Sequence, residues 1–197
     1  FHLDVKTHLG VEPAIELVLT DIHMPTMDGL EFIRELRKTA DSSVLIGAGT
    51  VLNSEMARRC VDAGAEFLVS PGLDIPTLEF AAREDKLMLA GALTPTEVIT
   101  AWSAGSELVK VFPCGQLGGA SYIKALKGPL PQVPMVPTGG VNLNTAGDFI
   151  KAGAAALGVG GELVQSDALK AGQPQIIVEN ARKFLAIVKQ AREKLAS

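Results

Sequence analysis

The chain has 197 residues, of which 47% are hydrophobic and 20% are charged, and its formal net charge is −4. This composition predicts one globular domain over residues 1–197 with a sizeable core, and it excludes a disordered chain. The mild acidity gives no electrostatic footprint for nucleic acid, and no apolar run is long enough to cross a bilayer, so neither is an expected partner.

Short runs typical of β-strands recur along the chain, and most are followed by turn residues and a helical stretch. They cover residues 2–8, 16–22, 44–49, 66–72, 87–93, 107–112, 134–139 and 155–160. Alternating strands and helices predict a parallel sheet, and eight such units favour a closed α/β barrel of the (β/α)8 TIM type. Only residues 9–15 separate the first two runs, so the first unit is expected to be truncated or irregular.

Several helices have recognisable ends in the sequence. Asn53, Thr94 and Asn142 precede helical stretches and offer side-chain oxygens to free backbone N–H groups. The same three stretches end in Ala-Gly, at 63–64, 104–105 and 152–153, where glycine can adopt the left-handed conformation. Residues 173–197 carry apolar side chains at helical spacing and predict a long final helix.

Lys110 lies inside the strand-like run 107–112. Alternation places Leu108, Lys110 and Phe112 on one face, which in a closed barrel can be the interior. An amine held there is poorly hydrated, so its pKa should fall by roughly 2–4 units and allow it to attack a ketone. The same pattern also fits a lysine at a strand end whose ammonium group reaches water.

Two glycine-bearing turns follow the last two strand-like runs. One contains Gly139 and Gly140, and the other contains Gly160 and Gly161. Loops in this position of a barrel often bind phosphate, because glycine lets backbone N–H groups converge on an anion. Taken singly, such turns are ordinary tight turns, and the acidic Glu162 after the second would repel phosphate unless it points away.

From about residue 44 onward the chain resembles the 2-keto-3-deoxy-6-phosphogluconate (KDPG) and 4-hydroxy-2-oxoglutarate aldolases. The resemblance rests on five blocks in the family's order, which are GAGTVL at 47–52, FLVSPG at 67–72, GALTPTE at 91–97, VKVFP at 109–113 and VPTGGV at 136–141. It implies a class I lyase that cleaves a phosphorylated 2-keto-3-deoxy sugar acid to pyruvate and an aldehyde, without a metal or cofactor.

The resemblance also implies roles for individual residues. Lys110 would form the Schiff base, and Phe112 would lie beside the substrate. Thr50, Pro71 and Thr138 match positions that line the pyruvate pocket, although the two threonines also fit a simple turn-capping role. Aldolases of this family are commonly trimers, so a homo-oligomer is implied.

Residues 16–38 resemble a different family, the receiver domains of bacterial response regulators, through the motif LTDIHMPTMDGLE at 19–31. There the aspartate matching Asp21 accepts a phosphoryl group. The acidic pair and the late lysine that a receiver needs are not found in their expected context, so phosphotransfer is not expected. We interpret residues 1–43 as a receiver-like, flavodoxin-type fragment joined to aldolase-type βα units over 44–197, a chimera of engineered or recombined origin.

This segment replaces the second-strand motif in which the aldolases carry a general-base glutamate and a substrate-binding arginine. Asp21 ends the same strand and is the candidate substitute base, while His23 is a candidate for the missing positive charge. Because a positioned base contributes about 10²–10⁴-fold, catalysis should be impaired or absent. The alternative is a catalytically inactive hybrid scaffold.

The remaining titratable residues suggest no metal centre. His2, His8 and His23 form no ligand constellation, and Cys60 and Cys114 match neither a disulfide framework nor metal-ligand spacing. With no signal-peptide pattern, a cytoplasmic protein is the expectation.

Overall fold

A computed structural model describes residues 17–22 and 28–196 of the chain. The chain divides into two compact units, one formed by residues 1–92 and 99–107 and the other by residues 93–98 and 108–197. The first predicted strand, at 2–8, lies outside the described residues. Within them, no helix is both long and apolar enough to span a membrane.

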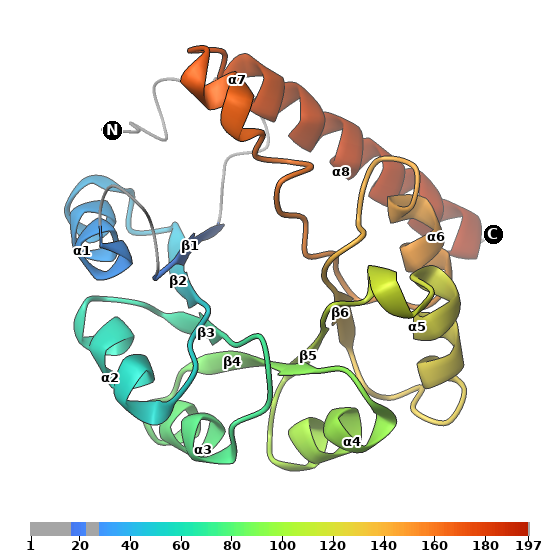
Figure 1. Ribbon diagram of the computed structural model, residues 1–197, viewed down its shortest axis with the longest axis horizontal. Helices are drawn as coiled ribbons and strands as arrows, with labels where there is room; N and C mark the ends of the chain where they lie inside the picture. Colours follow the sequence, from blue (N-terminus) through green and yellow to red (C-terminus); the bar gives the residue numbers. More distant parts are fainter. Residues whose placement is uncertain (1–16, 23–27, 197) are drawn as a thin grey trace. The chain divides into compact units, whose positions relative to one another are not determined.

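The first unit contains four parallel strands that pair in chain order (Figure 1). They are β1 (Leu17–Asp21), β2 (Leu45–Gly49), β3 (Phe67–Val69) and β4 (Leu87–Ala92). Their centres are apolar on both faces, as strands beneath a layer of helices must be. Ile46, Ala48 and Leu68, for example, are fully buried.

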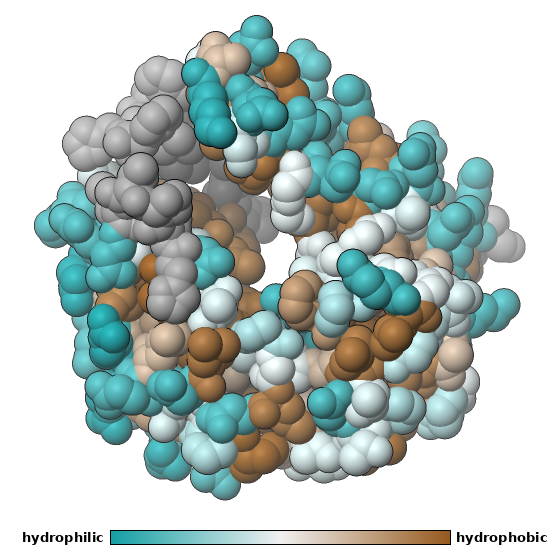
Figure 2. Space-filling view, viewed as in Figure 1, coloured by the Kyte–Doolittle hydropathy of each residue, from teal (hydrophilic) through white to brown (hydrophobic). Residues whose placement is uncertain are grey.

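Three helices alternate with these strands, namely α1 (Gly29–Thr39), α2 (Ser54–Asp62) and α3 (Ile75–Arg83). Each begins after a residue whose side chain accepts a backbone N–H, and the predicted cap Asn53 does so from Met56 at 2.8 Å. α1 buries Leu30, Ile33 and Leu36, whereas its outward surface is mostly hydrophilic (Figure 2). This amphipathic pattern holds α1 against the strands.

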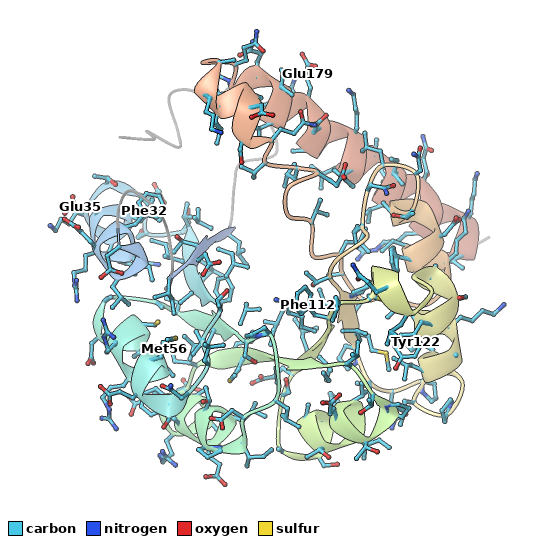
Figure 3. All side chains as sticks on the ribbon, in the orientation of Figure 1. Phe32, Glu35, Met56, Phe112, Tyr122 and Glu179 are labelled. Carbon is cyan, nitrogen blue, oxygen red and sulfur yellow. The ribbon has the colours of Figure 1, made fainter. Side chains whose placement is uncertain are left out.

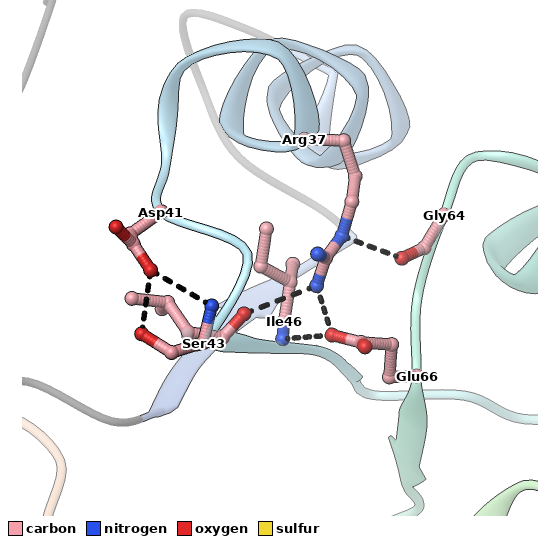
Figure 4. Close-up of polar contacts among 7 residues, drawn as sticks. Arg37, Asp41, Ser43, Ile46, Gly64 and Glu66 are labelled. Carbon is pink, nitrogen blue, oxygen red and sulfur yellow. Dashed lines mark hydrogen bonds and ion pairs between the residues drawn. The ribbon is translucent and has the colours of Figure 1, made fainter.

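A polar network joins the last turn of α1 to the amino-terminal ends of β2 and β3 (Figure 4). Arg37 donates to the carbonyl oxygens of Gly64 and Val44, at 3.2 Å each, and to the Glu66 carboxylate. Glu66 also accepts the N–H of Ile46 at 3.0 Å. Three segments of the first unit are thereby fixed by one guanidinium group.

The second unit contains the parallel pair β5 (Leu108–Val111) and β6 (Met135–Pro137). Its helical segments are the 3₁₀ turn η1 (Gly115–Leu117), α5 (Ala120–Lys127), α6 (Ala146–Lys151), α7 (Ser166–Lys170) and α8 (Gln175–Ala196). α8 packs against α6 and confirms the predicted long final helix. α4 (Pro95–Ser103) is divided between the two units.

The strand predicted at 155–160 is wrong. Within the described part of the second unit, this segment contributes one isolated parallel bridge, between Thr138 and Gly158. Glycine weakens a strand because it adds backbone entropy and brings no side chain to pack, and Gly158, Gly160 and Gly161 fall together here. The α/β class and the parallel strands are confirmed, whereas closure into a barrel stays a prediction.

Candidate functional site

Lys110 occupies the third position of β5, and the strand's two faces differ in burial. Val109 and Val111 have no exposed surface, whereas Leu108 and Lys110 are half-buried. The Lys110 Nζ lies 4.9 Å from the centre of the ring of Phe112, the residue labelled in Figure 3. The predicted alternation is therefore confirmed, and the aromatic face offers the ammonium form a cation–π contact.

The segment after β5 is tied to the turn after β6. The Thr138 N–H donates to the Val111 carbonyl at 3.0 Å, and the Cys114 N–H donates to the Thr138 carbonyl at 2.9 Å. Gly139 and Gly140, which follow, have φ angles of 84° and 77°, so this turn requires residues without a Cβ. Lys110, Phe112 and the Thr138–Gly139–Gly140 turn thus form one hydrogen-bonded region of the second unit.

The second glycine turn adjoins this region through Gly158. The Gly158 N–H donates to the Pro137 carbonyl at 2.9 Å, and a Cβ on Gly158 would lie only 2.2 Å from Thr138 Oγ1. Beyond it, Gly160 and Gly161 face open space, and the Gly160 carbonyl accepts the N–H groups of Leu163 and Val164. The turn is exposed and Glu162 with it.

A cavity that the sequence did not suggest lies on the same unit, with a volume of about 420 Å³. It lies among η1, the start of α5 and the loop that leads into α6, and it is lined by Gly115, Gln116, Gly118, Gly119, Ala120, Gly140, Thr145, Asp148 and Phe149. Gly115 and Gly140 approach so closely that a Cβ on Gly115 would lie 2.9 Å from the Gly140 Cα. No short motif signals this close approach, because the two glycines are distant in the sequence.

Asp21 and Thr50 lie at the carboxyl ends of neighbouring strands of the first unit. Asp21 ends β1 in register with Gly49, the residue before Thr50, and its side chain is exposed. Thr50 has a φ angle of 59°, a conformation that is strained for a β-branched residue. Such strain is common where a functional site determines the backbone.

Pro71 follows β3 in a turn held by the buried side chain of Ser70. The Ser70 hydroxyl donates to the Gly72 carbonyl at 2.7 Å and accepts the Gly91 N–H at 3.1 Å. A Cβ on Gly91 would lie 2.2 Å from the Pro71 carbonyl carbon, so glycine permits the turn to lie on β4. Ser70 and Gly91 were not singled out from the sequence, although both fall inside the quoted blocks.

The three histidines and the two cysteines were the other titratable residues considered in the sequence. His2, His8 and His23 lie outside the described residues. Among the residues that are described, no group of three His, Cys, Asp or Glu side chains is arranged to hold a metal ion. Cys60 and Cys114 are buried, and burial raises the pKa of each thiol to about 11, which makes both weak nucleophiles.

Comparison with known proteins places these features in one family. A family model described as KDPG and KHG aldolase matches residues 14–180. The match begins upstream of residue 44 and so includes the receiver-like segment. The KHG/KDPG aldolase of Escherichia coli K12 is 34% identical over 164 residues, which are 83% of this chain and 76% of that protein.

Solved structures agree with this assignment. The 4-hydroxy-2-oxoglutarate/2-dehydro-3-deoxyphosphogluconate aldolase from TTHB1 superposes with a TM-score of 0.75 at 30% identity, covering 88% of this chain and 81% of that one. The Legionella pneumophila KDPG aldolase, with pyruvate captured as a covalent carbinolamine, gives a TM-score of 0.77 at 28% identity and covers 88% and 82% of the two chains. The chain therefore belongs to the KDPG and KHG aldolase family.

Proposed function

We propose that this protein is a class I aldolase that cleaves a phosphorylated 2-keto-3-deoxy sugar acid through a Schiff base on Lys110. The observation that carries the proposal is the placement of Lys110 on β5, half-buried and with its Nζ above the Phe112 ring. The capture of pyruvate as a covalent carbinolamine in the Legionella relative supports covalent chemistry of this kind.

In the proposed cleavage, each bond that forms or breaks can be named. The Lys110 amine adds to the keto carbon of the substrate, and the carbonyl oxygen leaves as water to give an iminium ion. A base removes the proton of the hydroxyl group on C4, the C3–C4 bond breaks, and its electrons enter the iminium to form an enamine. The aldehyde departs, C3 takes up a proton, and water releases pyruvate and the free amine.

The other site residues have binding roles in this proposal. Thr50 and Thr138 bind the substrate carboxylate through their hydroxyl groups, and Pro71 shapes the pocket wall. The phosphate lies on the backbone N–H groups of the two glycine turns, at Gly139–Gly140 and Gly160–Gly161. The positive φ angles of Gly139 and Gly140 support this role, because they free the backbone to converge on an anion.

The general base is the part of the proposed catalytic site that differs from the family. Residues 16–38 do not carry the glutamate and arginine motif of the family, and Asp21, at the end of β1, is the carboxylate that we assign to the role. Its side chain is one methylene shorter than that of glutamate, so turnover should be about 10²–10⁴-fold below that of an enzyme with a well-placed base. The joining of a receiver-like fragment to the aldolase units is our explanation for this loss and stays a prediction.

A second candidate function is that of a barrel-type scaffold that binds keto acids but does not turn them over. The missing glutamate and arginine favour it. The two candidates differ in one measurable respect, because a scaffold with an intact Lys110 would form the covalent adduct without releasing pyruvate from the sugar acid.

The test begins with covalent trapping. The protein is incubated with pyruvate and borohydride, and peptides are analysed by mass spectrometry. We expect an added mass on the peptide that contains Lys110, no adduct in Lys110→Met, and a normal adduct in Lys124→Met, whose side chain is exposed on α5. An unmodified Lys110 in the wild-type protein would refute the Schiff-base proposal.

A coupled assay for pyruvate release then separates the two candidates. Slow release that is abolished by Asp21→Asn would support the aldolase with Asp21 as base. Adduct formation without any release would support the scaffold. Equal release by the wild-type protein and Asp21→Asn would overturn the role of Asp21.

A further inference from the structure

The peptide of Leu93, directly after β4, is held by side chains from two helices. Its N–H donates to Glu97 Oε2 on α4 at 2.9 Å, and its carbonyl accepts the hydroxyl group of Tyr122 on α5, a residue labelled in Figure 3. Here, side chains bind both backbone polar groups of one residue, so the position of Leu93 depends on two residues that can be changed singly.

Glu97 is the anionic half of this arrangement, which we call the Leu93 clamp and define as Glu97, Leu93 and Tyr122. The same Glu97 oxygen accepts the Thr94 N–H at 2.7 Å and the Thr94 hydroxyl at 2.9 Å. The backbone bonds from Thr94 and Leu93 hold the pKa of Glu97 below its usual value. Glu97 is thus ionised at neutral pH, and its hydrogen bonds are of the stronger, charge-assisted kind.

Tyr122 is the neutral half. Burial raises the pKa of its phenol, and the nearby Cys114 and Glu97 raise it further. The phenol therefore remains a hydrogen-bond donor at neutral pH. Cys114 belongs to the segment that follows Lys110 and Phe112 and whose N–H donates to Thr138. The Cys114 carbonyl accepts the Gly119 N–H at 3.2 Å, so the start of α5, the helix that carries Tyr122, is tied to the segment that follows the proposed Schiff-base residue, all within the second unit.

We propose that Glu97 and Tyr122 are positioning residues for the aldol reaction. They fix the backbone of Leu93, directly after β4, so that the loop from Leu93 to Pro95 stays linked through α5 to the segment that follows β5 during the reaction. Neither residue touches the substrate, and the inference rests on the proposed function. Since small displacements of a site wall can lower rates by about 10²-fold, losing one bond of the clamp should reduce turnover measurably.

The first experiment tests the clamp itself, independently of activity. The chain contains one tyrosine, so the ultraviolet absorbance of phenolate reports on Tyr122 alone. We expect a pKa above that of free tyrosine in the wild-type protein and a decrease in Glu97→Gln, because the neighbouring negative charge is lost. A wild-type pKa equal to that of free tyrosine, unchanged in Glu97→Gln, would overturn the clamp.

The second experiment tests positioning. The rate of borohydride-trapped adduct formation with pyruvate, and kcat and KM for cleavage where release is measurable, are compared among the wild-type protein, Tyr122→Phe and Ser121→Ala. Ser121 is the matched control, because its hydroxyl also donates to a backbone carbonyl from α5, that of Gly118 at 2.8 Å. We expect Tyr122→Phe to lower the trapping rate and kcat by about tenfold with little change in KM, and Ser121→Ala to lower neither.

The outcomes separate this inference from the proposed function. Normal trapping and kcat in Tyr122→Phe, beside a reactive wild-type protein, would overturn positioning and leave the aldolase proposal intact. A wild-type protein that forms no adduct would overturn the aldolase proposal and the positioning role together, while the tyrosine titration would still decide whether the clamp exists. Should Tyr122→Phe unfold, Glu97→Gln provides the same comparison, because Glu97 binds the Leu93 N–H whereas Tyr122 binds the Leu93 carbonyl.

Discussion

The Arg37 guanidinium, in the last turn of α1, donates to the carboxylate of Glu66, the residue before β3 (Figure 4). The same guanidinium binds the carbonyl groups of Gly64 and Val44. One side chain of α1 thus satisfies three acceptors that lie before β2 and β3. This specific set of contacts can be tested by mutation.

Replacing Arg37 with methionine should destabilise the protein by about 1–3 kcal/mol, since two backbone carbonyls and a carboxylate lose their donor. The pair is partly exposed, so the ionic contribution is the smaller part. Urea unfolding measures the change. The neighbouring Lys38→Met is the control, because the Lys38–Glu35 pair is exposed and should contribute little. Equal effects of the two substitutions would contradict a structural role for Arg37.

Gly91→Ala should destabilise the first unit, because the new Cβ would lie 2.2 Å from the Pro71 carbonyl carbon, and backbone cannot move as easily as a side chain. We expect a loss of about 1–3 kcal/mol in the free energy of unfolding. Gly72→Ala in the facing turn meets nothing within 4 Å and should be close to neutral. A stable Gly91→Ala protein would mean that the Pro71 turn does not lie on β4.

Gly158→Ala should disturb Thr138, because a Cβ at position 158 would meet Thr138 Oγ1 at 2.2 Å and Thr138 Cγ2 at 3.1 Å. We expect lower thermal stability and, on the proposed function, a higher KM for the keto acid. The double variant Gly158→Ala with Thr138→Ala removes both atoms and should recover part of the lost stability. A purely additive loss in the double variant would argue against this contact.

The lowered pKa of Glu97 predicts a pH dependence of stability. Its ordinary pKa of 4.5 applies in the unfolded chain, and its pKa in the folded chain is lower. Its stabilising contribution is therefore fully present above pH 4.5 and is lost as the pH falls through the folded-state value. The stability difference between the wild-type protein and Glu97→Gln should be larger at neutral pH than at a pH below the folded-state pKa. A difference that does not change with pH would refute this linkage.

Much of this fold could be predicted because its signals are local. The alternating apolar runs located all six strands of the described residues, and Asn53 and the Thr94–Glu97 pair located two helix starts. The run at 155–160 had the composition of a strand, but its glycines provide too little packing for a ladder, and the structure keeps one bridge there. The hydrophobic composition of a run does not reveal that its side chains pack too little to hold a strand.

The site was predictable where one strand sets the geometry and was missed where distant segments meet. Period-two alternation placed Lys110 beside Phe112 correctly. Tyr122 reaches the Leu93 carbonyl from 29 positions away, and Ser70 binds Gly91 across 21. Contacts of this separation leave no spacing pattern in a single sequence, because only the folded chain brings the partners together. The assignment of roles to Asp21, Thr50 and Pro71 stays a prediction.

The left-handed backbone of Thr50 has a consequence for any attempt to make this protein more robust. A β-branched residue in that conformation costs about 1–3 kcal/mol, so selection for heat resistance alone would favour glycine or asparagine there. Such a change would remove the hydroxyl group that we assign to the substrate carboxylate. At position 50, thermal endurance and ligand recognition therefore favour different amino acids.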